Sequence, residues 1–191
     1  MITKIRHLLL LSIASITPIQ SCFSAPLTYN EVAPILLGRC VMCHVPGGLM
    51  GDPPENYRLD TYAETVSRVN RARVVPGNAL ASELYRRIIG HSQPRMPFNG
   101  PPFLTDNEIS RVAQWINDGA RDATGNVAPD VTNARIRLHG HLTKRWTLDR
   151  LALEKHSGTR IKKSPQPGSY VRVLARIGAK GEIIMDRIES K

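Results

Sequence analysis

Hydrophobic residues recur at helical spacing along the first two thirds of the chain. Sequences of the form Thr-x-x-Glu begin at Thr28, Thr61 and Thr105, and this pattern is a capping box that starts a helix. The apolar positions that follow are Val32, Ile35 and Leu36; Val66 and Val69; and Ile109, Val112, Ala113 and Ile116. A fourth apolar face lies within residues 82–89. We therefore expect four helices before residue 120.

The last third of the chain alternates hydrophobic and polar residues instead. In residues 170–177, Val171, Val173, Ala175 and Ile177 alternate with polar or larger side chains, which indicates a half-buried strand. Residues 134–140, 146–153, 159–162 and 182–188 are further strand candidates, and glycine-containing turns separate the later ones. About five short strands in this length predict a small barrel.

Charge divides the chain at about the same point. Residues 25–129 contain ten Arg, no Lys and ten Asp or Glu, whereas residues 130–191 contain 14 Lys or Arg against six Asp or Glu. We expect four regions: a signal peptide (1–24), a helical domain (25–125), a linker (126–133) and a basic β-barrel domain (134–191).

The N-terminus has the pattern of a targeting segment. Lys4 and Arg6 precede an apolar run over residues 8–16 that is too short to span a bilayer. Cleavage after Ser24 would remove Cys22, whereas residues 19–22 resemble a lipoprotein box in which Cys22 would carry a lipid anchor; an uncleaved anchor is the third alternative. We expect an exported protein of the periplasm or cell envelope.

Cys40-Val41-Met42-Cys43-His44 is the attachment signature of a c-type haem. Each thiol adds to one vinyl group along the same porphyrin edge, and one helical turn places Cys40 and Cys43 on the same face. His44 can then bind the iron as its proximal ligand. A thioredoxin-like redox pair would follow a strand, and a zinc site would need a second Cys or His pair that the later sequence lacks.

The iron of such a haem has a second axial position. Met96 is the best candidate, because prolines at 94, 97, 101 and 102 would stiffen its loop and hold a weak thioether ligand. His91 is the rival ligand, and an open site is the third alternative.

Residues 28–122 resemble a class I cytochrome c domain of the planctomycete-type bacterial envelope kind. The stretches that carry the resemblance are residues 32–36 (VAPIL), 39–44 (RCVMCH), 75–77 (VPG), 82–88 (SELYRRI), 95–97 (RMP), 104–109 (LTDNEI) and 115–120 (WINDGA). The resemblance implies a mainly α cytochrome c fold with one covalent haem c, Cys40 and Cys43 as attachment sites, and His44 and Met96 as iron ligands. It also implies that the first and last helices cross, with Leu36 near Trp115.

The C-terminal residues resemble a small all-β, OB-like barrel of envelope proteins, which implies no activity. Its arginines, Arg135, Arg137, Arg172 and Arg176 among them, could bind an acidic protein or an anionic envelope surface. Nucleic acid is not expected as a partner, because the sequence offers no aromatic stacking platform.

The expected function is single-electron transfer between redox protein partners, without enzymatic activity. The alternative is a haem-based enzyme, or a gas or redox sensor, whose sixth ligand is labile.

Overall fold

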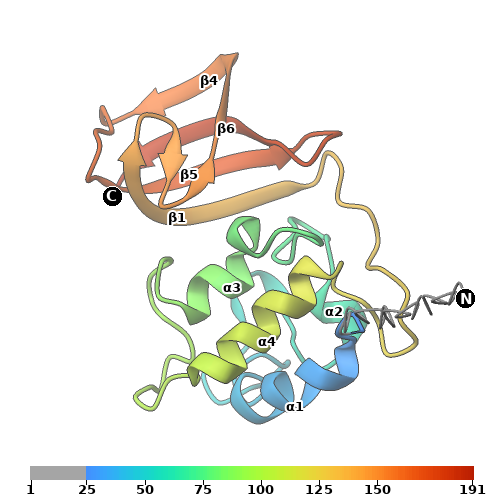
Figure 1. Ribbon diagram of the computed structural model, residues 1–191. Helices are drawn as coiled ribbons and strands as arrows, with labels where there is room; N and C mark the ends of the chain where they lie inside the picture. Colours follow the sequence, from blue (N-terminus) through green and yellow to red (C-terminus); the bar gives the residue numbers. More distant parts are fainter. Residues whose placement is uncertain (1–24) are drawn as a thin grey trace, which may run out of the picture.

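A curled, six-stranded sheet lies over a group of short helices (Figure 1). The computed structural model describes residues 25–191. Its helices are α1 (Tyr29–Arg39), α2 (Tyr62–Thr65), α3 (Glu83–Ile88) and α4 (Asp106–Asn117), with 3-10 turns η1 (Pro54–Asn56) and η2 (Ala79–Ala81). Its strands are β1 (Arg135–Lys144), β2 (Thr147–Leu148), β3 (Leu151–Ala152), β4 (Glu154–Lys162), β5 (Tyr170–Ile177) and β6 (Ile183–Ser190).

The prediction of a mainly α cytochrome c fold followed by a small, OB-like barrel is wrong. The structure is mainly β, with 23% helix in four short helices, and its sheet is a half-barrel. Capping boxes mark where helices begin but not how far they extend. The apolar positions that follow Thr61 predict a helix as far as Val69, but the helix that forms, α2, ends at Thr65. Between these helices the chain runs through long proline- and glycine-containing loops.

Capping nevertheless fixes the two longest helices. Thr28 and Glu31 form a complete capping box at the start of α1, and Thr105 and Glu108 form another at the start of α4. The two helices pack against each other, and Leu36 and Trp115 lie in the same buried cluster, as expected.

The sheet has the order β3-β2-β1-β5-β6-β4, in which β4 pairs with β6 in parallel and all other neighbours are antiparallel. β5 covers the predicted residues 170–177, and its Val171, Val173, Ala175 and Ile177 are buried as the alternation required. β4 begins at Glu154, five residues earlier than predicted. The sequence did not reveal this start, because the first residues of the strand are exposed and carry no apolar pattern.

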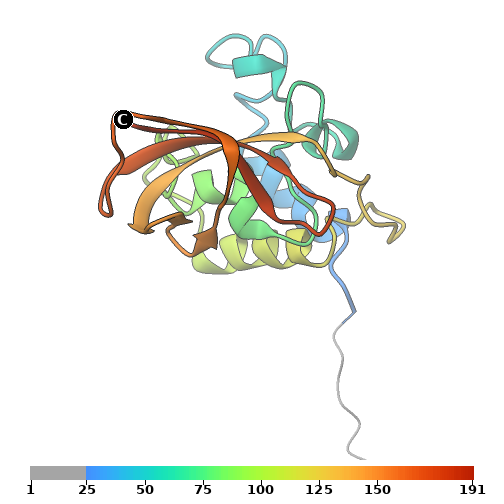
Figure 2. The ribbon, with the colours of Figure 1, turned by 90° about the horizontal axis from the view of Figure 1, so that it is seen from above.

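The sheet and the helical part share a core. Ala72, Val75 and Ala81, which precede α3, pack into the buried cluster formed by the inner residues of β1, β5 and β6. Seen from above in Figure 2, the sheet lies across the helices. The predicted linker, residues 126–133, contains no helix or strand, but its Val131 also joins this core.

Arg86 of α3 forms the main polar contact between the two parts. Its side chain is fully buried, it forms an ion pair with Asp149, and its Nε and Nη2 donate to the carbonyl oxygen of His139 at 3.0 and 2.8 Å. Gly140 is required beside this contact, because a Cβ there would overlap both Arg86 Nη2 and Asp149 Oδ2. The α3 helix is thereby held in place beneath β1.

Candidate functional site

The Cys-x-x-Cys-His motif of residues 40–44 follows α1 directly and forms a tight turn. The backbone N–H of Cys43 donates to the carbonyl oxygen of Cys40 at 3.2 Å, and that of His44 donates to the same oxygen at 3.0 Å. Both thiols are free; Cys40 is buried and Cys43 is half-buried. The turn therefore presents two thiols and an imidazole from one short segment.

The environments of the two thiols differ. Burial raises the pKa of Cys40 to about 12, although the nearby Arg39 charge acts in the opposite direction. A thiol with so high a pKa carries almost no thiolate at neutral pH, so Cys40 is a weak nucleophile in this fold.

The His44 ring is oriented by the backbone of Tyr57. Nδ1 of His44 lies 2.9 Å from the carbonyl oxygen of Tyr57, and because a carbonyl can only accept, Nδ1 carries the hydrogen. The other ring nitrogen, Nε2, is then the one with a free lone pair for a metal. Tyr57 is itself buried, which raises the pKa of its hydroxyl. The loop before α2 thus fixes the tautomer of His44.

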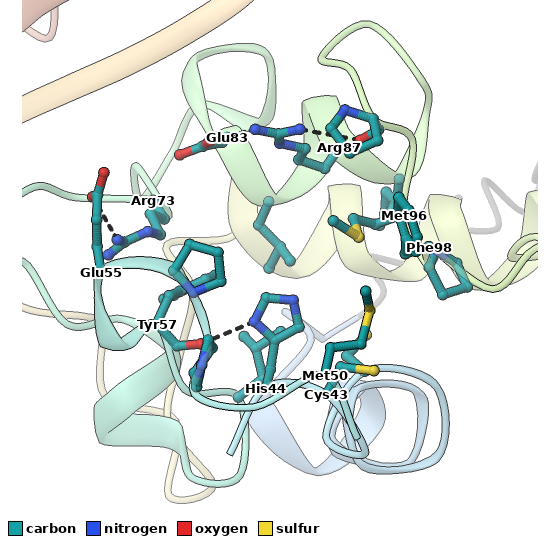
Figure 3. A pocket seen from close by; sticks show the side chains of 18 of the residues that line it. Cys43, His44, Met50, Glu55, Tyr57, Arg73, Glu83, Arg87, Met96 and Phe98 are labelled. Atoms are coloured by element: carbon teal, nitrogen blue, oxygen red, sulfur yellow. Dashed lines mark hydrogen bonds and ion pairs between the residues drawn. The ribbon is translucent and has the colours of Figure 1, made fainter. Parts of the chain in front are cut away.

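A cavity of about 420 Å³ opens beside the motif and is lined by Cys40, Cys43, His44 and Met96. Figure 3 shows the His44 ring and the Met96 side chain entering this pocket from different sides, with Cys43 beside His44. The backbone N–H of Met96 donates to the carbonyl oxygen of Arg87 at 3.1 Å, which ties its loop to the end of α3. All four predicted site residues therefore meet in one pocket.

His91, the rival ligand, does not line this pocket. Its Nδ1 lies 3.5 Å from Asp149, on the side of α3 that faces the sheet. Burial lowers the pKa of His91, with the Asp149 charge acting against that shift. The geometry favours Met96 over His91.

A network of arginines and glutamates forms one edge of the pocket and was not predicted. Glu55 accepts from Arg71 at 2.8 Å and from Arg73 at 2.8 Å, and it lies 2.7 Å from Arg137 of β1. Arg71 also pairs with Glu83. Partial burial acts to raise the pKa of Glu55, but hydrogen bonds and charges from Arg71 and Arg137 hold it below its ordinary value.

Glu55 is held in an unusual conformation at the centre of this network. It has a left-handed backbone with φ 56°, and Asn56 after it has φ 53°. Such a conformation costs energy for a residue with a Cβ, so surrounding contacts must maintain it. No short sequence motif indicates this network, because its members come from four separate segments of the chain.

The donor set of the pocket fits a haem. An imidazole and a thioether enter from different sides, two thiols also line the cavity, and the volume is within the range of small-molecule sites. Five arginines line the cavity, each paired with a carboxylate of the chain: Arg39, Arg71, Arg73, Arg87 and Arg137. A porphyrin carboxylate would share or replace such a partner. Residues 25–191 contain no group of three or more His, Cys, Asp or Glu able to hold a metal ion; a haem iron needs only one histidine and one methionine from the chain.

The predicted basic docking face is largely neutralised within the sheet. Arg172 lies 3.1 Å from Glu189, Arg176 lies 2.9 Å from Asp186, and Arg137 pairs with Glu55 as described. Within residues 25–191, Arg135 is the member of the predicted set that forms no ion pair.

The predicted signal peptide and the predicted lipid anchor at Cys22 lie outside the described residues. Among residues 25–191 there is no helix of the length and apolar character needed to cross a membrane.

Comparison of the chain with known protein families, with curated proteins and with solved structures gave no match in any of the three.

Proposed function

We propose that this protein carries one covalent c-type haem and transfers single electrons between redox protein partners. Cys40 and Cys43 would hold the porphyrin, and His44 and Met96 would bind the iron. When bound, the group supplies one-electron chemistry by changing between its ferric and ferrous states. The observation that supports this best is the convergence of these four residues on one pocket.

The remaining pocket residues have roles that follow from their chemistry. The Tyr57 carbonyl keeps the His44 ring in one orientation and strengthens it as a ligand. Arg73 stacks on the Tyr57 ring, with its guanidinium carbon 4.4 Å from the ring centre, and so stands at the pocket edge as a charged group. Arg73 and Arg87 would neutralise the porphyrin carboxylates.

Exposed apolar side chains at the mouth of the pocket suit contact with a protein partner. Met42, Met50 and Phe98 line the pocket and are 48%, 66% and 57% exposed. Electrons would leave on this side, next to the thiols. A location in the periplasm or cell envelope, with or without a lipid on Cys22, is part of this proposal.

Covalent attachment is tested by expression with a haem-attachment system. Mass spectrometry of the denatured protein should show one retained haem, and Cys40→Ala and Cys43→Ala should each weaken retention. Recovery of the apo-protein mass alone from the unmodified chain would contradict the proposal.

Iron ligation is tested by carbon monoxide binding to the reduced protein. The unmodified protein should resist carbon monoxide, because both axial positions are filled, and Met96→Ala should bind it. Met50→Ala is the matched control, since Met50 lines the same pocket but is largely exposed, and it should behave like the unmodified protein. Ready binding by the unmodified protein would instead support the sensor or enzyme alternative.

A further inference from the structure

A second hollow, of about 780 Å³, lies between the polar face of the sheet and the segment around residues 55–71. Its charged lining residues are Arg71, Arg135, Arg137, Arg160 and Arg187 with Glu55 and Asp186. Five guanidinium groups thus face two carboxylates. The proposed electron-transfer function makes no use of this basic groove.

The register of the sheet gathers these arginines in one row. Arg137 of β1 is paired with Leu174 of β5, Leu174 with Arg187 of β6, and Arg187 with Arg160 of β4. Directly paired residues project from the same face of a sheet. Three strand spacings of about 4.8 Å place the whole row within roughly 15 Å.

Like charges oppose each other directly within this groove. Arg160 of β4 is the direct partner of Arg187 of β6, and both line the groove. Like charges at paired positions destabilise a sheet. A bound anion would remove that repulsion.

The carboxylates present pair with Arg71 and Arg137 but leave the other three lining arginines without a close partner. Arg135 and Arg160 form no ion pair with any of residues 25–191, and Arg187 lies 3.9 Å from Glu189. Nε of Arg137 is buried and has no hydrogen-bond partner in the described part of the chain. Asp186 is already engaged by two nitrogens of Arg176, Nε at 3.1 Å and Nη2 at 2.9 Å.

We propose that the basic groove binds a small oxyanion that carries several negative charges. Guanidinium groups recognise phosphate and carboxylate oxygens through paired, charge-assisted hydrogen bonds. The lining contains no aromatic residue on which a nucleic-acid base could stack, and the volume is that of a small-molecule site. The proposal stands independently of the haem.

The groove also shares a wall with the first pocket. Glu55, Arg71 and Arg137 line both hollows. An anion in the groove would compete with Glu55 for Arg137. Anion binding should therefore alter the ion pairs in the wall that the groove shares with the neighbouring pocket.

Titration calorimetry on the full-length protein tests the proposal, with pyrophosphate and citrate as probes and acetate as the monovalent control. Either multivalent anion should bind with one-to-one stoichiometry, and the affinity should fall as sodium chloride is added. Tighter binding of pyrophosphate would identify a phosphate ligand, and tighter binding of citrate a polycarboxylate. Absence of binding by both at low salt would overturn the proposal.

Variants locate the binding within the groove. Arg160→Gln and Arg187→Gln should each weaken binding about tenfold, as expected for loss of a charge-assisted contact. Arg111→Gln is the matched control, because it removes the same charge from an exposed position on α4. If Arg111→Gln weakens anion binding equally, the anion is attracted only by the overall positive charge of the protein, and the proposal is overturned. If either variant unfolds, Arg135→Gln replaces it, because Arg135 is the exposed first residue of β1 and forms no ion pair within residues 25–191. The rise in melting temperature of the unmodified protein with pyrophosphate gives a second readout.

Discussion

Arg86 of α3 and Asp149, in the turn between β2 and β3, form a buried ion pair that joins the helical part of the chain to the sheet. The Arg86 side chain is fully buried, and that of Asp149 is 12% exposed. Burial acts to lower the pKa of Arg86, and the Asp149 charge opposes that effect. A pair of this kind matters most when one partner is removed, because the other charge is then buried alone.

Arg86→Met should therefore destabilise the protein by about 3–5 kcal/mol, as measured by urea unfolding. The variant removes the charged partner of Asp149 and the two Arg86 donors to the His139 carbonyl; the backbone N–H of His141 and the Ser92 hydroxyl remain as donors to these oxygens. Arg87→Met is the matched control and should cost about 1 kcal/mol or less, because Arg87 is partly exposed and pairs with Glu83 at 3.3 Å. Equal losses in the two variants would contradict a special role for the buried pair.

Deletion of residues 130–191 should destabilise the helical part rather than leave it intact. The sequence alone suggested two separable modules, but Ala72, Val75 and Ala81 belong to the core of the sheet. Deletion would expose these apolar residues and would leave the Arg86 side chain without its partners Asp149 and His139. Thermal unfolding of the truncated and full chains measures the effect; an unchanged melting temperature would show that the shared core contributes little.

His139 should make stability fall in mild acid. Burial and the positive charges of Arg87, Arg137 and Arg172 lower its pKa from 6.5 to about 4, with Glu83 acting against them. Between these two values the unfolded chain binds a proton that the folded chain does not, so the free energy of unfolding decreases as the pH falls through this window.

The test compares urea unfolding of the unmodified protein and His139→Gln at about pH 7 and about pH 5. The unmodified protein should lose more stability than the variant across this interval. His156→Gln, on exposed β4, serves as the control and should follow the unmodified protein. Identical losses in all three proteins would show that His139 does not carry the effect.

The two thiols should differ in reactivity towards an alkylating reagent. In the folded, reduced apo-protein, Cys43 is half-buried, whereas Cys40 is buried with a pKa of about 12. Peptide mapping after brief treatment with iodoacetamide should show modification at Cys43 well before Cys40. Urea should make the two rates similar; equal rates without urea would mean that Cys40 is accessible in the native state.

Local signals in the sequence predicted local features well. The capping boxes located the starts of α1 and α4, the alternation located β5, and the motif with its following methionine located the four residues that meet in the pocket. Each of these signals is contained in a short segment, and neighbouring residues decide the outcome.

Features that depend on distant residues escaped prediction. The curl of the sheet and the parallel pairing of β4 with β6 arise from non-local strand contacts. Glu55 is important only because β1 brings Arg137 beside it, whereas the sequence pattern assigns Arg137 to a docking face. Charge counts along the sequence could not show that these arginines are paired within the fold.

The burial of Cys40 sets an order of events for biogenesis. If both thiols receive a porphyrin, the bond at Cys40 must form while the end of α1 is still open, since the closed fold shields that sulfur and suppresses its thiolate. Cofactor insertion would then precede the final packing of the chain. Attachment enzymes would then have to act before the chain closes around Cys40, not on the finished structure.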